Sequence, residues 1–150
     1  MRGATLSLKG RALKYLAARE HSRAELIRKL SPHAESEDEV VRILDELESK
    51  GLLSAERFAE SVVHRKAARF GAARLKAELQ QHQLPDELTR SVVQSLRETE
   101  MERARALWLK RFGQPPETPD DRAKQVRFLS NRGFSGEVIR QVLKGLDSAD

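Results

Sequence analysis

Apolar residues recur along this chain at the three- and four-residue spacing of amphipathic helices, and the pattern returns about every 50 residues. The clearest copies are the segments 40–47 (VVRILDEL), 89–96 (TRSVVQSL) and 139–146 (IRQVLKGL), which are offset by 49 and 50 residues. The match is one of helix faces rather than of identities, because Ile27, Lys76 and Val126 share one column. A fixed period of this length indicates one supersecondary unit that occurs three times.

Capping residues divide the first unit into three helices. Ser22 and Glu25 have the spacing of a capping box, and Ser36 and Glu39 repeat it before the next apolar stripe. Gly51 follows that stripe, where a left-handed C-terminal cap is expected.

The second and third units carry comparable boundaries. Ser54 opens a helix, Gly71 separates it from the next, and Pro85 begins the last helix of the second unit. In the third unit the irregular linker 113–117 precedes Thr118, which has the position of an N-cap.

These signals predict an all-α fold, an elongated array of three tandem three-helix repeat units with nine helices. We expect the units to span residues 1–51, 52–98 and 99–150. A bundle of three short helices has little interior, so each unit should lean on its neighbour. Aromatic side chains of the third unit lie on or beside the apolar stripes and are interpreted as core: Trp108, Phe112, Phe128 and Phe134.

Composition limits the cellular compartments and the kinds of binding site that are consistent with this chain. The chain has 150 residues, no cysteine and 34% charged residues, so disulfides and thiolate metal sites are excluded. No apolar run approaches the roughly 20 residues that span a bilayer, and the N-terminus lacks a signal-peptide pattern. We expect a cytoplasmic protein without membrane contact.

Catalytic chemistry is hard to assemble from these residues. The four histidines (His21, His33, His64 and His82) have no metal-ligand spacing, and no glycine-rich phosphate loop is present. We therefore expect no enzyme activity, no catalytic or metal-binding residues and no cofactor.

Charge is distributed unevenly. Residues 61–77 hold five cations and no acid, whereas residues 33–48 hold seven acids against Arg42. Such polarity suits a partner attracted by charge, either nucleic acid or an acidic protein. The five cations are Arg65, Lys66, Arg69, Arg74 and Lys76. The alternative, that they only form a solvated helix face, stays open from charge alone.

A stand-alone DNA-binding protein of the helix-turn-helix type is the second functional hypothesis. Residues 22–53 read as helix, turn and helix, as in winged-helix domains. A wing would require two strands after Leu53, yet Ser54 starts a capped helix. The would-be recognition helix is also acidic, which opposes approach to phosphates.

The motifs together resemble the RecX family over nearly the whole chain. The resembling segments are Tyr15 to Leu26, Lys29-Leu30, Leu47, Lys50 to Leu53, Glu56 to Ala59, Arg65, Gly71, Arg74-Leu75, Glu78-Leu79, Lys124, Arg127 to Leu129, Arg132 to Phe134, and Glu137 to Ile139. The chain departs from the usual pattern at Ser54-Ala55, at Val62 and at Arg69-Phe70-Gly71.

The resemblance implies a regulator of homologous recombination and DNA repair. Such proteins bind the RecA filament, limit its growth and depress its ATPase and strand exchange. It implies a monomer that reaches single-stranded DNA weakly or through the filament. The candidate contact residues are the cations of residues 61–77 together with Arg127 and Arg132, which lie in the third-unit motif.

Overall fold

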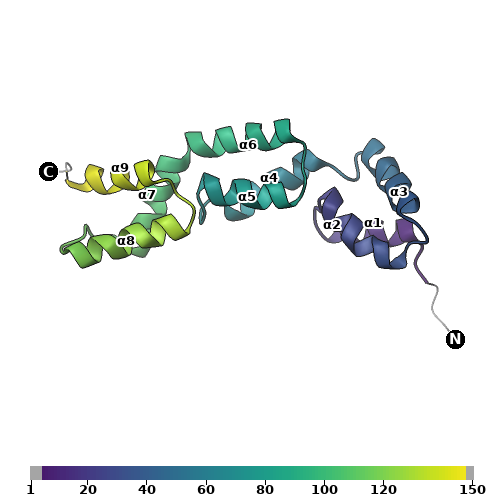
Figure 1. Cartoon of the computed structure of the whole chain (residues 1–150), viewed down its shortest axis with the longest axis horizontal. Helices are drawn as coiled ribbons and strands as arrows, with labels where there is room; N and C mark the ends of the chain where they lie inside the picture. Colours follow the sequence, from purple (N-terminus) through teal and green to yellow (C-terminus); the bar gives the residue numbers. More distant parts are fainter. Residues whose placement is uncertain (1–4, 148–150) are drawn as a thin grey trace.

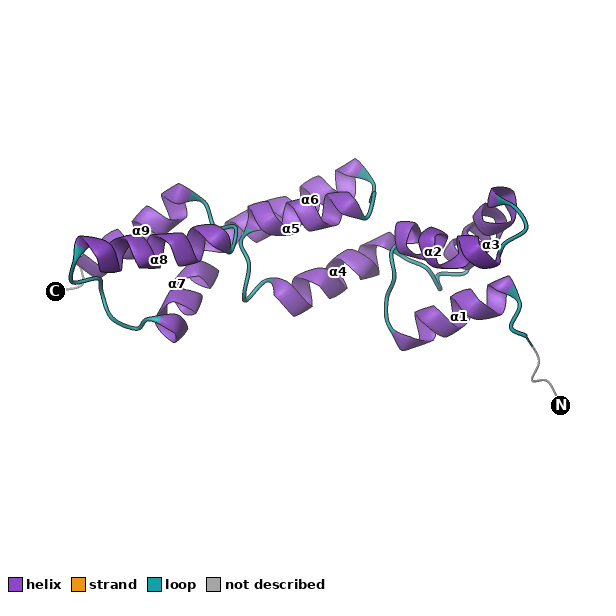
Figure 2. Ribbon diagram, turned by 60° about the horizontal axis from the view of Figure 1, so that its bottom comes forward, coloured by secondary structure: helices purple, strands orange, loops and turns teal. Residues whose placement is uncertain are grey.

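The computed structural model describes the backbone of residues 5–147 and side chains as far as Gly145. Within that part the chain forms nine α-helices and one short 3-10 turn, with no strand (Figure 2). The helices are α1 (Leu8–Ala18), α2 (Arg23–Leu30), α3 (Glu37–Ser49), α4 (Ala55–Lys66), α5 (Ala72–Gln81), α6 (Asp86–Glu98), α7 (Glu100–Arg111), α8 (Pro119–Asn131) and α9 (Gly136–Asp147), and the 3-10 turn is η1 (Ser31–His33).

The helices gather into three groups that lie in a row (Figure 1). α1 to α3 form the first repeat at one end, α4 to α6 the second repeat in the middle, and α7 to α9 the third repeat at the other end. The prediction of an all-α, elongated array of three-helix units is confirmed.

The helix ends follow the capping residues closely. Ser22 and Glu25 form the reciprocal capping box at the start of α2. At α3, Ser36 caps the amide of Glu39, but the Glu39 carboxylate accepts from the amide of Glu35 instead of closing a box. Gly51 has φ +75°, as a left-handed C-terminal cap requires.

Each repeat has its own apolar core. Three separate clusters of buried residues are found, with principal members Leu26, Leu30 and Leu44 in the first, Phe58, Leu75 and Leu79 in the second, and Trp108, Leu129 and Leu143 in the third. Among the aromatic residues predicted as core, Trp108 and Phe134 are buried, whereas Phe112 and Phe128 are only half-buried. Neighbouring repeats therefore contact one another mainly through polar groups and backbone rather than through a shared core.

The first junction, between the first and second repeats, is made by side chains. Arg57 of α4 donates to the carboxylate of Glu20 at 2.9 Å, and the Ser22 hydroxyl meets Nδ1 of His82 at 2.8 Å. The Glu25 carboxylate lies 4.0 Å from the same imidazole nitrogen. Among the described residues, no backbone–backbone hydrogen bond joins the first repeat to α5 or α6.

Beside this junction, His21 is buried and held neutral. Lys29 Nζ lies 2.9 Å from His21 Nε2, and because an ammonium only donates, Nε2 must accept. The proton is therefore on Nδ1, which donates to the Arg19 carbonyl at 3.1 Å. Burial lowers the pKa of His21, and the charges of Arg19 and Lys29 add to this, whereas the hydrogen bond to the Arg19 carbonyl and the charge of Glu25 oppose it.

Glu25 supports the same region with the opposite charge. Burial alone would raise the pKa of Glu25, but hydrogen bonds from Arg19 and from the Ser22 amide outweigh it and bring the pKa to about 2. The ion pair between Arg19 and Glu25 is short, with Nη2 and Oε2 2.7 Å apart, and the Glu25 side chain is only 9% exposed.

The second junction, between the second and third repeats, is made by backbone. Gly71 donates its amide to the Arg132 carbonyl at 2.7 Å. A Cβ at Gly71 would lie 2.3 Å from the Gly133 oxygen, and a Cβ at Gly133 would lie 2.4 Å from Arg74 Cβ. Only glycine at both positions permits this approach, and Gly133 also has φ +89°.

Groups of the third repeat cap helix ends of the second repeat. The Ala72 amide at the start of α5 donates to the buried carboxylate of Glu100 at 2.9 Å. Arg103 donates to the carbonyls of Ala67 and Phe70 after α4, each at 2.7 Å. Burial lowers the pKa of Arg103, although Glu100 partly offsets this.

Substitution of Gly71 by alanine should destabilise the protein by roughly 2–4 kcal/mol, because the new methyl group overlaps backbone that cannot move aside without breaking the junction. The measurement is urea unfolding followed by circular dichroism. Gly136→Ala is the matched control, since its Cβ would meet only Arg140 at 3.9 Å. Equal unfolding midpoints for the two variants would contradict the packing argument.

Acidification should weaken the fold in two steps. The folded pKa of His21 lies below its ordinary value of 6.5, so the unfolded chain takes up the proton first and stability is lost as pH falls below that value. The Glu25 contribution is present above 4.5 and is lost as pH falls toward its folded pKa of about 2.

The free energy of unfolding, measured in urea from pH 8 to pH 3, tests this dependence. His21→Gln should reduce the upper step, which His82 shares because burial lowers its pKa too. Glu25→Gln should reduce the lower step, which Glu46 shares because hydrogen bonds from Lys9 and Lys50 lower its pKa to about 2. His64→Gln is the control because His64 is exposed. A His21→Gln protein with the parent's pH slope between pH 7 and pH 5 would refute the assignment.

Candidate interaction surface at the second junction

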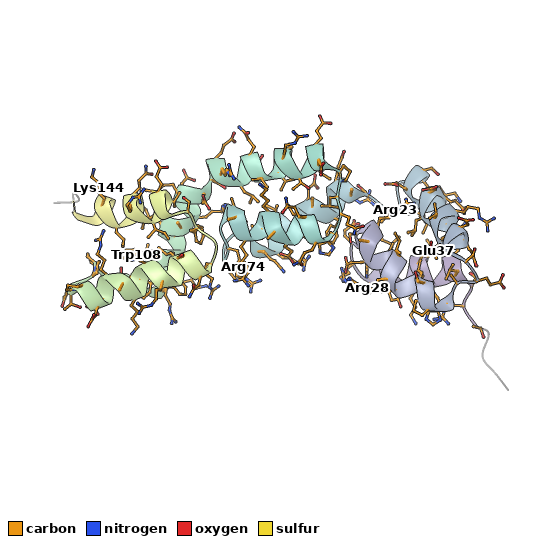
Figure 3. The ribbon with its side chains drawn as sticks, in the orientation of Figure 1. Arg23, Arg28, Glu37, Arg74, Trp108 and Lys144 are labelled. Carbon is orange, nitrogen blue, oxygen red and sulfur yellow. The ribbon has the colours of Figure 1, made fainter. Side chains whose placement is uncertain are left out.

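The close approach of Gly71 and Gly133 places basic residues from two repeats side by side. Arg69 lies in the turn after α4, Arg74 in the first turn of α5, and Arg132 at the end of α8. Figure 3 shows Arg74 at the boundary between the second and third repeats. Arg74 also donates to the Asn131 carbonyl across the junction at 3.3 Å.

Three guanidinium groups surround the ring of Phe70. The Cζ atoms of Arg74, Arg69 and Arg132 lie 4.0, 5.3 and 5.5 Å from the ring centroid. These distances are those of cation–π contacts. Within residues 5–147 none of the three forms an ion pair with a carboxylate, so their charge is not neutralised locally.

The stacking continues onto the third repeat. Arg132 also lies over Phe128, with its Cζ at 5.0 Å, and Arg111 lies over the same ring at 5.3 Å. Phe112 meets Phe128 edge to face at 5.4 Å. We call this set the arginine–aromatic ladder: Arg69, Arg74, Phe70, Arg132, Phe128, Arg111 and Phe112.

The arrangement suits an anionic ligand that also has flat faces. A guanidinium stacked on a ring keeps its N–H donors in one plane, where they can bind phosphate or carboxylate oxygens. Alternating cations and aromatic rings are the features with which proteins hold single-stranded nucleic acid.

The other predicted contact residues are placed differently. Lys66 forms an ion pair with Glu78, so its charge is partly neutralised. Arg65 is exposed and donates to the Ser61 carbonyl of its own helix at 3.2 Å. Lys76 lines a groove between α5 and α6, and Arg127 is exposed on α8. Three of the seven predicted cations thus meet in the ladder, and four lie outside it.

Sequence reasoning missed the aromatic half of the ladder and one cation. Phe128 and Phe112 were interpreted as core because they lie near apolar stripes, and Phe70 was noted only as part of a departing motif. Arg111 carries no signal beyond its place at a helix end. Arg103, which joins the two repeats, is likewise one cation among many in the sequence.

Among residues 5–147 there is no group of three or more histidine, aspartate or glutamate side chains arranged to hold a metal ion. None of the described helices has the length and apolar character needed to cross a membrane.

Comparison with known families matches all three repeats. The models of the first, second and third three-helix domains of RecX match residues 9–47, 56–93 and 98–143. These matches follow the three groups of helices in the structure.

Relatives that match almost the whole chain have the same family name. The chain is 56% identical over 142 residues to a protein of Leptothrix cholodnii named regulatory protein RecX, covering 95% of this chain and 90% of that one. A protein of the same name from Ralstonia nicotianae is 57% identical over 143 residues, covering the same shares.

Solved structures share the fold. The crystal structure of RecX from Lactobacillus salivarius superposes with a TM-score of 0.78 at 22% identity, covering 93% of this chain and 94% of that one. A second crystal structure of a regulatory protein RecX gives a TM-score of 0.77 at 21% identity, covering 96% and 82%. With three matched domains in order and relatives above half identity over almost the full length, this chain belongs to the RecX family.

Proposed function

We propose that this protein inhibits the RecA recombinase by binding along the RecA filament on DNA, and thereby regulates homologous recombination and DNA repair. Membership of the RecX family is the observation that carries the proposal. The protein acts by binding rather than by catalysis, as a monomer in the cytoplasm, and requires no cofactor.

The shape of the molecule supports this mode of action. Three small bundles in a row present a long surface relative to their mass (Figure 1). A solenoid-like array of this kind can contact successive protomers of a helical polymer at once, whereas a compact domain of equal size contacts one or two. Several weak contacts in one molecule then add to a tight attachment.

The arginine–aromatic ladder is the proposed contact with the single-stranded DNA inside the filament. Its unneutralised guanidiniums attract phosphates, and its stacked planes accept bases without reading their sequence. Arg65 and Arg127 extend the same positive potential along α4 and α8, and Lys66 and Lys76 contribute to it from α4 and α5.

Free DNA recognition by a helix-turn-helix is the weaker alternative. α3 would be the recognition helix of the first repeat, but its exposed first turn carries Glu37 and Asp38, which form no ion pair among the described residues and repel phosphates. The segment that would form a wing is α4, which starts at Ala55 directly after the Ser54 cap.

Titration of the protein into a RecA ATPase assay on single-stranded DNA tests the proposal. Hydrolysis by RecA should fall in a saturable manner, while the protein alone should hydrolyse no nucleotide above background. An unchanged RecA rate at a tenfold molar excess over filament sites would reject the proposed function.

The double variant Arg65→Glu and Arg69→Glu should weaken inhibition about tenfold, as expected from losing and reversing two exposed ionic contacts. Its inhibition should also depend less steeply on salt concentration, because fewer counterions are released on binding. Both arginines are exposed, so helix content should be retained.

Lys14→Glu with Arg140→Glu is the matched control, since both residues are exposed and the change in net charge is equal. Full inhibitory potency and the parent's salt slope in the Arg65/Arg69 variant would mean that these cations only face solvent.

A further inference from the structure

The second repeat contains a groove that the ladder does not use. It lies between α5 and α6 and has a volume of about 1040 Å³. Its floor is formed by Leu84, Thr89 and Val93, which are 8%, 6% and 6% exposed. Exposed cations line its sides, with Lys76 on α5 facing Arg90 and Arg97 on α6.

The first repeat lacks this cationic lining. With the offset of 49 residues, Ile27 and Val41 of the first repeat take the places of Lys76 and Arg90, and both are apolar. Arg97 corresponds to Glu48 of the first repeat, and the Glu48 carboxylate forms an ion pair with Arg23, with Nη1 and Oε1 3.1 Å apart.

The floor differs in the same way. Thr89 stands where the first and third repeats have Val40 and Ile139, which are buried at 2% and 3% exposure. The polar floor position and the set of three cations therefore occur together only in the middle repeat, because the third repeat keeps a single cation, Arg140 in the place of Arg90.

The three cations of the groove are available to a ligand. Within the described residues Lys76, Arg90 and Arg97 form neither an ion pair nor a side-chain hydrogen bond, whereas Lys66 on the neighbouring helix is paired with Glu78. Arg90 and Arg97 are seven residues apart on α6, so they lie on one face two turns apart.

We propose that this groove docks an acidic amphipathic helix of a partner protein. Apolar side chains of that helix would pack on the aliphatic stems of Lys76, Arg90 and Arg97 above the buried floor. Two of its carboxylates, seven residues apart, would pair with Arg90 and Arg97. A further carboxylate on the other flank would meet Lys76. α6 has 13 residues, so a helix of about 12 residues, or about 18 Å, matches the groove in length.

The lining of the groove favours a peptide over nucleic acid. None of the residues that line the groove is aromatic, so it offers no stacking platform for bases. Asp86 and Glu98, at the two ends of α6, also line it and would repel the acidic groups of any ligand, so the carboxylates of the docked helix must lie between them, opposite Arg90 and Arg97. This contact is separate from the ladder and does not depend on the identity of the partner as RecA.

Fluorescence anisotropy with a labelled synthetic peptide tests the groove directly. The probe is a helix of about 15 residues with a leucine stripe flanked by glutamates seven residues apart. Its comparison is a scrambled peptide of the same composition, which keeps the charge but loses the two faces. The full-length protein should bind the helical probe at least about fivefold more tightly than the scrambled one.

Arg90→Glu with Arg97→Glu should weaken binding of the helical probe about tenfold. Lys14→Glu with Arg140→Glu, which changes net charge equally at exposed sites outside the groove, should change it less than about twofold. If the double reversal loses helix content, Arg90→Gln with Arg97→Gln replaces it and should weaken binding in the same direction.

Four outcomes overturn the proposal. The first two are that the helical probe does not bind, or that both peptides bind equally. The third is that the groove variant and the control variant lose the same probe affinity, and the fourth is that oligothymidylate displaces the probe and the groove variant loses as much affinity for the oligonucleotide as for the probe. The last outcome assigns the groove to nucleic acid. Because this assay contains no RecA, its failure is distinct from failure of the ATPase titration.

Discussion

The backbone contact between Gly71 and Gly133 is the constraint on which the second half of the array depends. It brings the end of α8 against the start of α5 and lets the third repeat supply caps that the second lacks, through Glu100 and Arg103. α5 has no side-chain cap of its own, because its N-cap residue is Gly71. The same contact puts Arg132 next to Phe70 and so creates the ladder.

The fold could be predicted because its determinants are local. Caps such as Ser22 and Ser54 act within three residues, and the apolar stripes record which face each helix buries. The candidate site could be predicted only in part. The cationic stretch was visible, but the ion pair of Lys66 with Glu78 and the contact of Arg132, from another repeat, with Phe70 depend on side chains that are distant in sequence.

Phe128 illustrates why the remainder was beyond sequence analysis. Its place beside an apolar stripe is equally consistent with a core ring and with a ring stacked between Arg111 and Arg132. Which of the two occurs is decided by how close the neighbouring repeat approaches, and that depends on two glycines 62 residues apart. Repetition of one helix pattern thus preserves the architecture while positions outside the buried stripes, such as the column of Ile27, Lys76 and Val126, are free to differ.

The contrast between the two junctions gives the array unequal joints. The second is fixed by main chain in direct contact, whereas the first is held by the tips of Arg57, Glu20, Ser22 and His82. Side-chain tips rearrange more readily than packed backbone, so we expect the joint between α3 and α4 to be the more compliant of the two. An array with one stiff and one compliant joint loses the conformational entropy of only one hinge when a partner fixes its shape.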